Sequence, residues 1–92
     1  MADIVILGSD DCDTCREIKD MISNLEESVD FVDIDTDEGI DRVKQMVEKG
    51  FKLDDLTVPQ CVVVYNDGII DNCDTEGFYN RLKYRLKRKL GG

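Results

Sequence analysis

Two of the four cysteines stand three residues apart, a spacing that suits dithiol chemistry. Cys12 and Cys15 follow a short apolar segment, at the point where an amphipathic helix is expected to begin. Two sulfurs on the first turn of a helix can close a small disulfide ring with almost no backbone movement. The amides and dipole of a helix N-terminus also stabilise a thiolate, which is the nucleophile in disulfide exchange. We therefore predict a redox dithiol in which the more exposed Cys12 attacks and Cys15 resolves the mixed disulfide.

The same spacing also occurs in metal sites and in pairs of inert thiols. A zinc ribbon would need a second close pair of cysteines, and Cys61 and Cys73 are 12 residues apart. We predict no metal at this site. Cys61, in an apolar segment, is expected to be a small buried hydrophobic residue. Cys73 is expected to be either a structural or spectator residue or a regulatory third thiol.

The only proline, Pro59, precedes the most apolar segment of the chain. A proline is tolerated at the start of a strand, which is the simplest interpretation. With a dithiol upstream, a second interpretation is a cis Val58–Pro59 peptide that faces the dithiol. That geometry would leave the backbone N–H and C=O of Val58 free to pair with an extended substrate segment.

Hydrophobic periodicity predicts alternating strands and helices in one α/β domain over residues 1–92. The first two strands should be parallel, and Asn66-Asp67-Gly68 should close an antiparallel hairpin between the last two. In the last helix, Phe78, Leu82 and Leu90 are among the residues expected to face inward. The order is strand, helix, strand, helix, strand, strand, helix, over residues 3–8, 14–26, 29–35, 40–47, 60–65, 69–71 and 75–90.

The charge of the chain is divided along its length. The formal net charge is −9, yet residues 78–92 contain six basic residues and no acidic one. The acidic remainder argues against a nucleic-acid partner for the whole chain. No apolar run approaches the roughly 20 residues that span a bilayer, and no signal peptide is visible, so we expect no membrane partner and a cytoplasmic location.

Together, Cys12-Asp13-Thr14-Cys15 and Thr57-Val58-Pro59-Gln60, followed by Cys61-Val62-Val63-Val64, resemble the corresponding segments of glutaredoxins. The resemblance covers nearly the whole chain. It implies a thioredoxin-like fold, with a four-stranded mixed sheet and helices on both faces. It also implies a monomeric thiol–disulfide oxidoreductase without a tightly bound cofactor. The implied partners are a protein disulfide and an electron donor, either glutathione or a reductase.

The resemblance also implies a substrate site around the dithiol. In place of the glycines that receive glutathione in this family, the chain has Asp71-Asn72-Cys73-Asp74. An acidic rim is expected around Cys12, and it opposes binding of the anionic glutathione. The rim comprises Asp10, Asp11, Asp13, Asp54, Asp55 and Asp74. The predicted site consists of catalytic Cys12 and Cys15 with substrate-binding Asp13, Thr14, Val58, Pro59, Cys73 and Asp74.

Two other functions remain open from the sequence. One is a metal or iron–sulfur carrier, using Cys12 with glutathione, or Cys12 and Cys15 with Cys73. The other is an adaptor that binds a partner through its basic C-terminal helix, with the thiols incidental. The adaptor predicts that Arg81, Arg85 and Arg88 matter more than Cys12.

Overall fold

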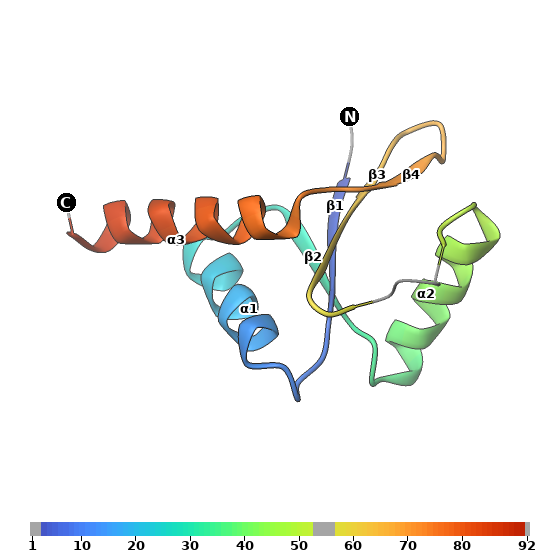
Figure 1. Ribbon diagram of the computed structural model, residues 1–92, viewed down its shortest axis with the longest axis horizontal. Coiled ribbons are helices and arrows are strands. Elements are labelled where there is room, and N and C mark those ends of the chain that lie inside the picture. The colour runs from blue at the N-terminus through green and yellow to red at the C-terminus, as the bar shows by residue number, and fades with distance from the viewer. Residues whose placement is uncertain (1–2, 53–56, 92) are drawn as a thin grey trace.

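The computed structural model describes residues 3–52 and 57–91, which form a small α/β domain (Figure 1). The predicted order of elements is confirmed, and observed ends lie within three residues of those expected. The elements are β1 (Asp3–Gly8), α1 (Asp13–Leu25), β2 (Val29–Asp33), α2 (Asp37–Glu48), β3 (Gln60–Val64), β4 (Ile70–Asn72) and α3 (Thr75–Gly91).

The strands form an open mixed sheet in the order β2-β1-β3-β4. β1 pairs with β2 in parallel, as predicted, and with β3 in antiparallel orientation. β3 and β4 form the predicted antiparallel hairpin, whose turn contains Gly68 at a φ of 88°, a conformation that favours glycine. Because β1 and β3 run in opposite directions, the last residues of β1 and the first residues of β3 lie side by side at the same end of the two strands.

Helices cover both faces of the sheet, since alternate residues of the central strands point to opposite sides. On one face, Leu7 of β1 packs in a cluster with Val43 of α2. On the other face, Ile6 packs in a cluster with Ile18 of α1 and Leu82 of α3. Figure 1 shows α1 and α3 together on one side and α2 on the other.

The last turns of α3 extend beyond the sheet (Figure 1). Phe78 and Leu82 are buried, but Leu90 is 77% exposed. The prediction that Leu90 faces inward is therefore wrong, because the helix continues past the surface that its first turns cover. Among the described residues, no helix is both long and apolar enough to cross a membrane.

Candidate functional site

Cys12 is the N-cap residue of α1. Its Sγ accepts a hydrogen bond from the backbone N–H of Cys15 at 3.1 Å. Its own N–H donates to the carbonyl of Ser9 at 3.2 Å, which closes the turn between β1 and α1. The sulfur thus takes the role that a serine or aspartate oxygen usually has at a helix start. The Cys12 side chain is only partly buried, so its sulfur remains accessible to an incoming disulfide.

Cys15 lies one turn further along α1 and has no exposed surface. It packs against Gly8 at the end of β1, where a Cβ atom would come within 3.1 Å of the Cys15 Cβ and 2.5 Å of the Phe31 ring. Burial, followed by the hydrogen bond with Cys12, raises the pKa of the Cys15 thiol to about 11. The predicted difference in exposure between the two thiols is confirmed. The roles assigned to them stay a prediction.

The segment before β3 places a backbone carbonyl beside the dithiol. The Cys12 Sγ lies 3.9 Å from the carbonyl oxygen of Val58, to which the thiol can donate. The Val58–Pro59 peptide is cis, as predicted. Leu7 pairs with Gln60 across β1 and β3, and this register brings the two strand ends together. The Val58 carbonyl, expected to be free for a substrate, is thus in contact with Cys12.

Part of the acidic rim lies at the turn that carries Cys12. Asp10, Asp11 and Asp13 are all exposed there. Asp13 forms an ion pair with Arg16 on the next turn of α1, so its charge is partly compensated. An ion pair this exposed is screened by solvent and leaves the surface around Cys12 acidic.

Sequence reasoning missed one further carboxylate near this turn. The Ser9 hydroxyl donates a hydrogen bond to the carboxylate of Asp35, which follows β2. Ser9 Oγ also accepts from the N–H of Asp11 at 3.2 Å. Parallel pairing of β1 and β2 could have indicated this contact, because both strands end at the same edge. Asp54 and Asp55, also predicted to belong to the rim, lie outside the described residues.

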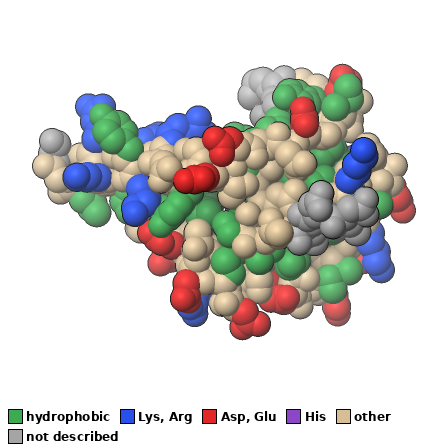
Figure 2. Space-filling model, viewed as in Figure 1, with side chains coloured by type: hydrophobic (Ala, Val, Ile, Leu, Met, Phe, Trp, Pro, Cys, Tyr) green, Lys and Arg blue, Asp and Glu red, His purple; other side chains and the backbone are tan. Residues whose placement is uncertain are grey.

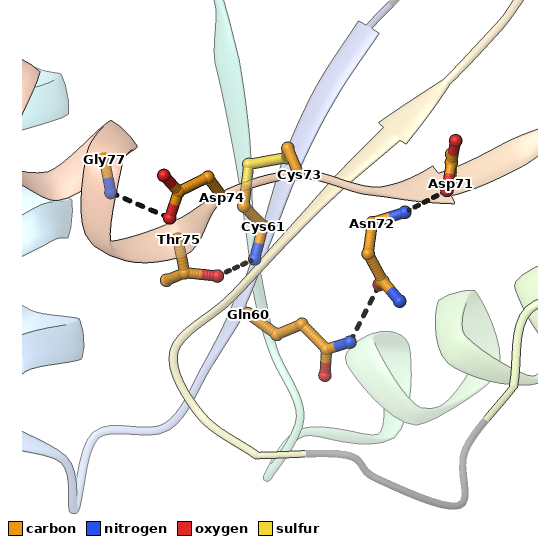
Figure 3. Close-up of a disulfide and its surroundings, with 8 residues drawn as sticks. All are labelled: Gln60, Cys61, Asp71, Asn72, Cys73, Asp74, Thr75 and Gly77. Carbon is orange, nitrogen blue, oxygen red and sulfur yellow. Dashed lines mark hydrogen bonds between the residues drawn. A yellow bond between two sulfur atoms is a disulfide. The ribbon is translucent and has the colours of Figure 1, made fainter.

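Cys61 and Cys73 form a disulfide between β3 and the segment that precedes α3 (Figure 3). Cys61 is 1% exposed, which confirms its expected burial, but treating the two cysteines as separate residues was wrong. The predicted hairpin between the last two strands could have indicated this disulfide, because its register determines which cysteines face each other. Val62 pairs with Asn72, so the next opposed positions are 61 and 73. Their Cα atoms are 5.1 Å apart, within the range of disulfides.

Asp74 lies at the start of α3, where its carboxylate accepts a hydrogen bond from the Gly77 N–H at 3.0 Å (Figure 3). With both disulfide cysteines and Arg81, it lines a cavity of about 350 Å³. The residues lining this cavity come from β1, β3, α3 and the segment before α3, and none from α1 or the turn before it. Cys73 and Asp74 are therefore found at the disulfide, and their predicted substrate-binding role stays a prediction.

The predicted site residues are found at two features of the described structure. Cys73 and Asp74 line the cavity at the disulfide. The others lie at the start of α1 or in the segment facing it, namely Cys12, Asp13, Thr14, Cys15, Val58 and Pro59.

Comparisons with models of protein families, with curated proteins and with solved structures find no match to this chain.

Proposed function

We propose that the protein is a glutaredoxin-like thiol–disulfide oxidoreductase of the thioredoxin-like class, which reduces protein disulfides. One observation carries the proposal: an accessible Cys12 sulfur at a helix N-terminus lies one turn from a fully buried Cys15. Dithiol exchange needs one thiol that meets the substrate and a second that is held ready behind it. The carbonyl of Val58 beside Cys12 supports the proposal, because backbone at this position can also contact a substrate.

Reduction takes place in two exchange steps. The Cys12 thiolate attacks one sulfur of the substrate disulfide, forming a mixed disulfide, and the displaced substrate thiolate takes up a proton. Cys15 then gives up its proton to solvent and attacks the Cys12 sulfur, which releases the second substrate thiol. Two electrons pass to the substrate, and the protein is left with a Cys12–Cys15 disulfide. Because the pKa of Cys15 is raised to about 11, we expect the second step to accelerate as pH increases.

An external donor must return these two electrons, and we propose glutathione or a reductase. Asp10, Asp11 and Asp13 oppose the two carboxylates of glutathione through their charge, and salt weakens this repulsion. We therefore favour a protein substrate with a basic docking surface. The proposal includes a monomer that acts in the cytoplasm without a tightly bound cofactor.

The carrier hypothesis loses one of its two ligand sets in this structure. Cys73 is bonded to Cys61 and therefore cannot join Cys12 and Cys15 in binding a metal. A thiolate must be free to ligate iron or zinc. Its other ligand set, Cys12 with glutathione, places the glutathione carboxylates beside the acidic rim.

The adaptor remains a second candidate, because of the surface of α3. Figure 2 shows Lys and Arg side chains clustered along this projecting helix. Tyr84 and Leu90 on the same helix are 61% and 77% exposed. Arg85 pairs with Glu27, while Arg88 lies over the Tyr84 ring with its charge available to a partner. Basic and apolar groups together suit an acidic protein surface.

The proposed activity is tested by following insulin reduction with dithiothreitol as donor. Cys12→Ser should reduce insulin no faster than dithiothreitol alone, because a serine hydroxyl does not attack a disulfide and only a thiolate can carry out the exchange. Cys73→Ser is the matched control, since it also replaces one cysteine by serine, and it should keep most of the activity. An equal rate in Cys12→Ser and the unmodified protein would rule out the proposal. Loss of partner binding in Arg88→Glu, with unchanged insulin reduction, would instead favour the adaptor.

A further inference from the structure

We propose that Cys61 and Cys73 form a second exchange site, at which a low-molecular-weight thiol forms a mixed disulfide with Cys73. The two sulfurs differ in access in the same sense as those of Cys12 and Cys15. Cys61 is 1% exposed and belongs to the core beneath α1 and α3, whereas Cys73 is only partly buried. A thiolate must approach the sulfur that it attacks, so access selects Cys73.

The surroundings of the disulfide leave space for such an attack. The cavity of about 350 Å³ is lined by both cysteines and by Ile4, Asp74 and Arg81 among others. The Arg81 guanidinium lies over the Phe78 ring at 5.3 Å, which holds a positive charge at this cavity. This charge attracts a thiolate, and the carboxylate of Asp74 partly offsets it. The cavity therefore combines an accessible sulfur with mixed charge, in contrast to the acidic rim at Cys12.

The backbone around the pair is held by bonds that do not involve sulfur. The Cys73 N–H donates to the Cys61 carbonyl at 3.1 Å. The Cys61 N–H donates to Thr75 Oγ1 at 3.0 Å (Figure 3). Gln60 and Asn72, on the neighbouring positions, are joined by a side-chain hydrogen bond of 2.9 Å. These contacts can remain when the sulfur–sulfur bond opens. The two sulfurs therefore stay close, and the bond can form again.

Opening transfers two electrons in two steps. The thiolate of an external dithiol attacks Cys73 Sγ, a bond forms between these two sulfurs, and Cys61 leaves and takes up a proton from solvent. The second thiol of the reductant then loses its proton and displaces Cys73, so that the reductant becomes a disulfide. One molecule of a monothiol completes only the first step, and a second molecule must attack its sulfur to release Cys73 and form the disulfide of the reductant. Cys61 can reverse the first step only as a thiolate, and the apolar core disfavours that form.

The proposal concerns the fate of Cys73 alone and does not depend on the function proposed for Cys12. It is tested in the Cys12→Ser/Cys15→Ser double variant, which keeps only the second pair. Dithiothreitol should open the pair at a rate proportional to its concentration, while the circular dichroism of the folded chain persists. Brief treatment with iodoacetamide should then label Cys73 at least about tenfold more than Cys61, as read from peptide masses.

Two further variants separate the sulfurs in the same double-variant background. With Cys61→Ala added, glutathione disulfide should place one glutathione on Cys73. With Cys73→Ala added, it should place none on Cys61. The proposal is wrong if the pair opens only in denaturant, if opening unfolds the chain, or if Cys61 takes label or glutathione as readily as Cys73. Should a variant fail to fold, the four-cysteine chain can be treated and mapped in the same way, with the same criteria.

Discussion

The molecule contains two cysteine pairs, each with one accessible and one buried sulfur, but they differ in what they join. Cys12 and Cys15 are free thiols on a single turn of α1. Cys61 and Cys73 are bonded across the base of a hairpin, 12 residues apart. A crosslink stabilises a fold mainly by restricting the unfolded chain, and a longer loop restricts it more. The comparison indicates that the second pair stabilises the fold as a crosslink, whereas the first pair forms no crosslink and its thiols are available for chemistry.

The largest expected effect is the loss of insulin reduction when Cys12 is replaced, and it tests the assignment of the chemistry to the first pair. Cys12→Ser and Cys12→Ala should both lower the rate of insulin reduction by about a thousandfold or more, because each removes the nucleophile. Their stabilities should differ, since serine can replace the sulfur as N-cap and alanine cannot. Urea unfolding should show Cys12→Ala to be less stable than Cys12→Ser by about 1 kcal/mol. Activity that survives either change would mean that Cys12 is not the attacking residue.

The second prediction concerns the stability provided by the other pair. Cys73→Ser should lower the free energy of unfolding by about 3 kcal/mol, the chain-entropy value for a loop of this length. The unmodified protein with its disulfides reduced serves as the control and should unfold at a similar urea concentration. Insulin reduction by the folded variant should change by no more than about twofold. Unchanged stability would show that the disulfide does not support the hairpin.

Most of the fold could be predicted from the sequence, because local patterns determine it. Alternating apolar residues and the Asn66-Asp67-Gly68 turn gave the order of elements and the antiparallel hairpin. The disulfide was missed because cysteines were considered by their spacing rather than by the hairpin register. The contact between Ser9 and Asp35 depends on where two parallel strands end, which periodicity does not specify. Leu90 was misplaced because the pattern of a helix does not show where its partner surface stops.

The third prediction concerns alkaline pH and the buried member of the first pair. The pKa of Cys15 is raised from 9.0 to about 11, chiefly by burial, so the folded chain holds this proton more tightly than the unfolded chain. The protonated Cys15 thiol contributes fully to the free energy of unfolding below pH 9, and this contribution is lost as pH rises toward 11. In the unmodified protein with Cys12 and Cys15 as free thiols, the free energy of unfolding should fall by roughly 2 kcal/mol over this interval. Cys15→Ala should remove that loss, and an identical decline in both proteins would contradict the assignment.

The smallest expected effect concerns the acidic rim and separates the surroundings of the two pairs. Asp10→Lys/Asp11→Lys should increase the rate with glutathionylated substrates by a few-fold at low salt, and the gain should shrink as salt rises. Asp71→Lys is a matched control, because Asp71 is an exposed carboxylate on β4. A steady-state assay at two salt concentrations measures both variants. If the double lysine variant gains no more than the control, the rim does not determine which substrates are used.

The most direct test of the two-pair account is to trap the first exchange step. In Cys15→Ser the attacking thiol is retained, but the mixed disulfide cannot be resolved by Cys15. Incubating the variant, with Cys12 reduced and the Cys61–Cys73 disulfide intact, with a disulfide-bonded peptide, followed by acid quenching and peptide mapping, shows which sulfur holds the peptide. The account predicts one peptide for each chain, on Cys12, with Cys15→Ser/Cys73→Ser giving the same yield. A peptide found mainly on Cys61 or Cys73, or no trapped species in a folded variant, would contradict it.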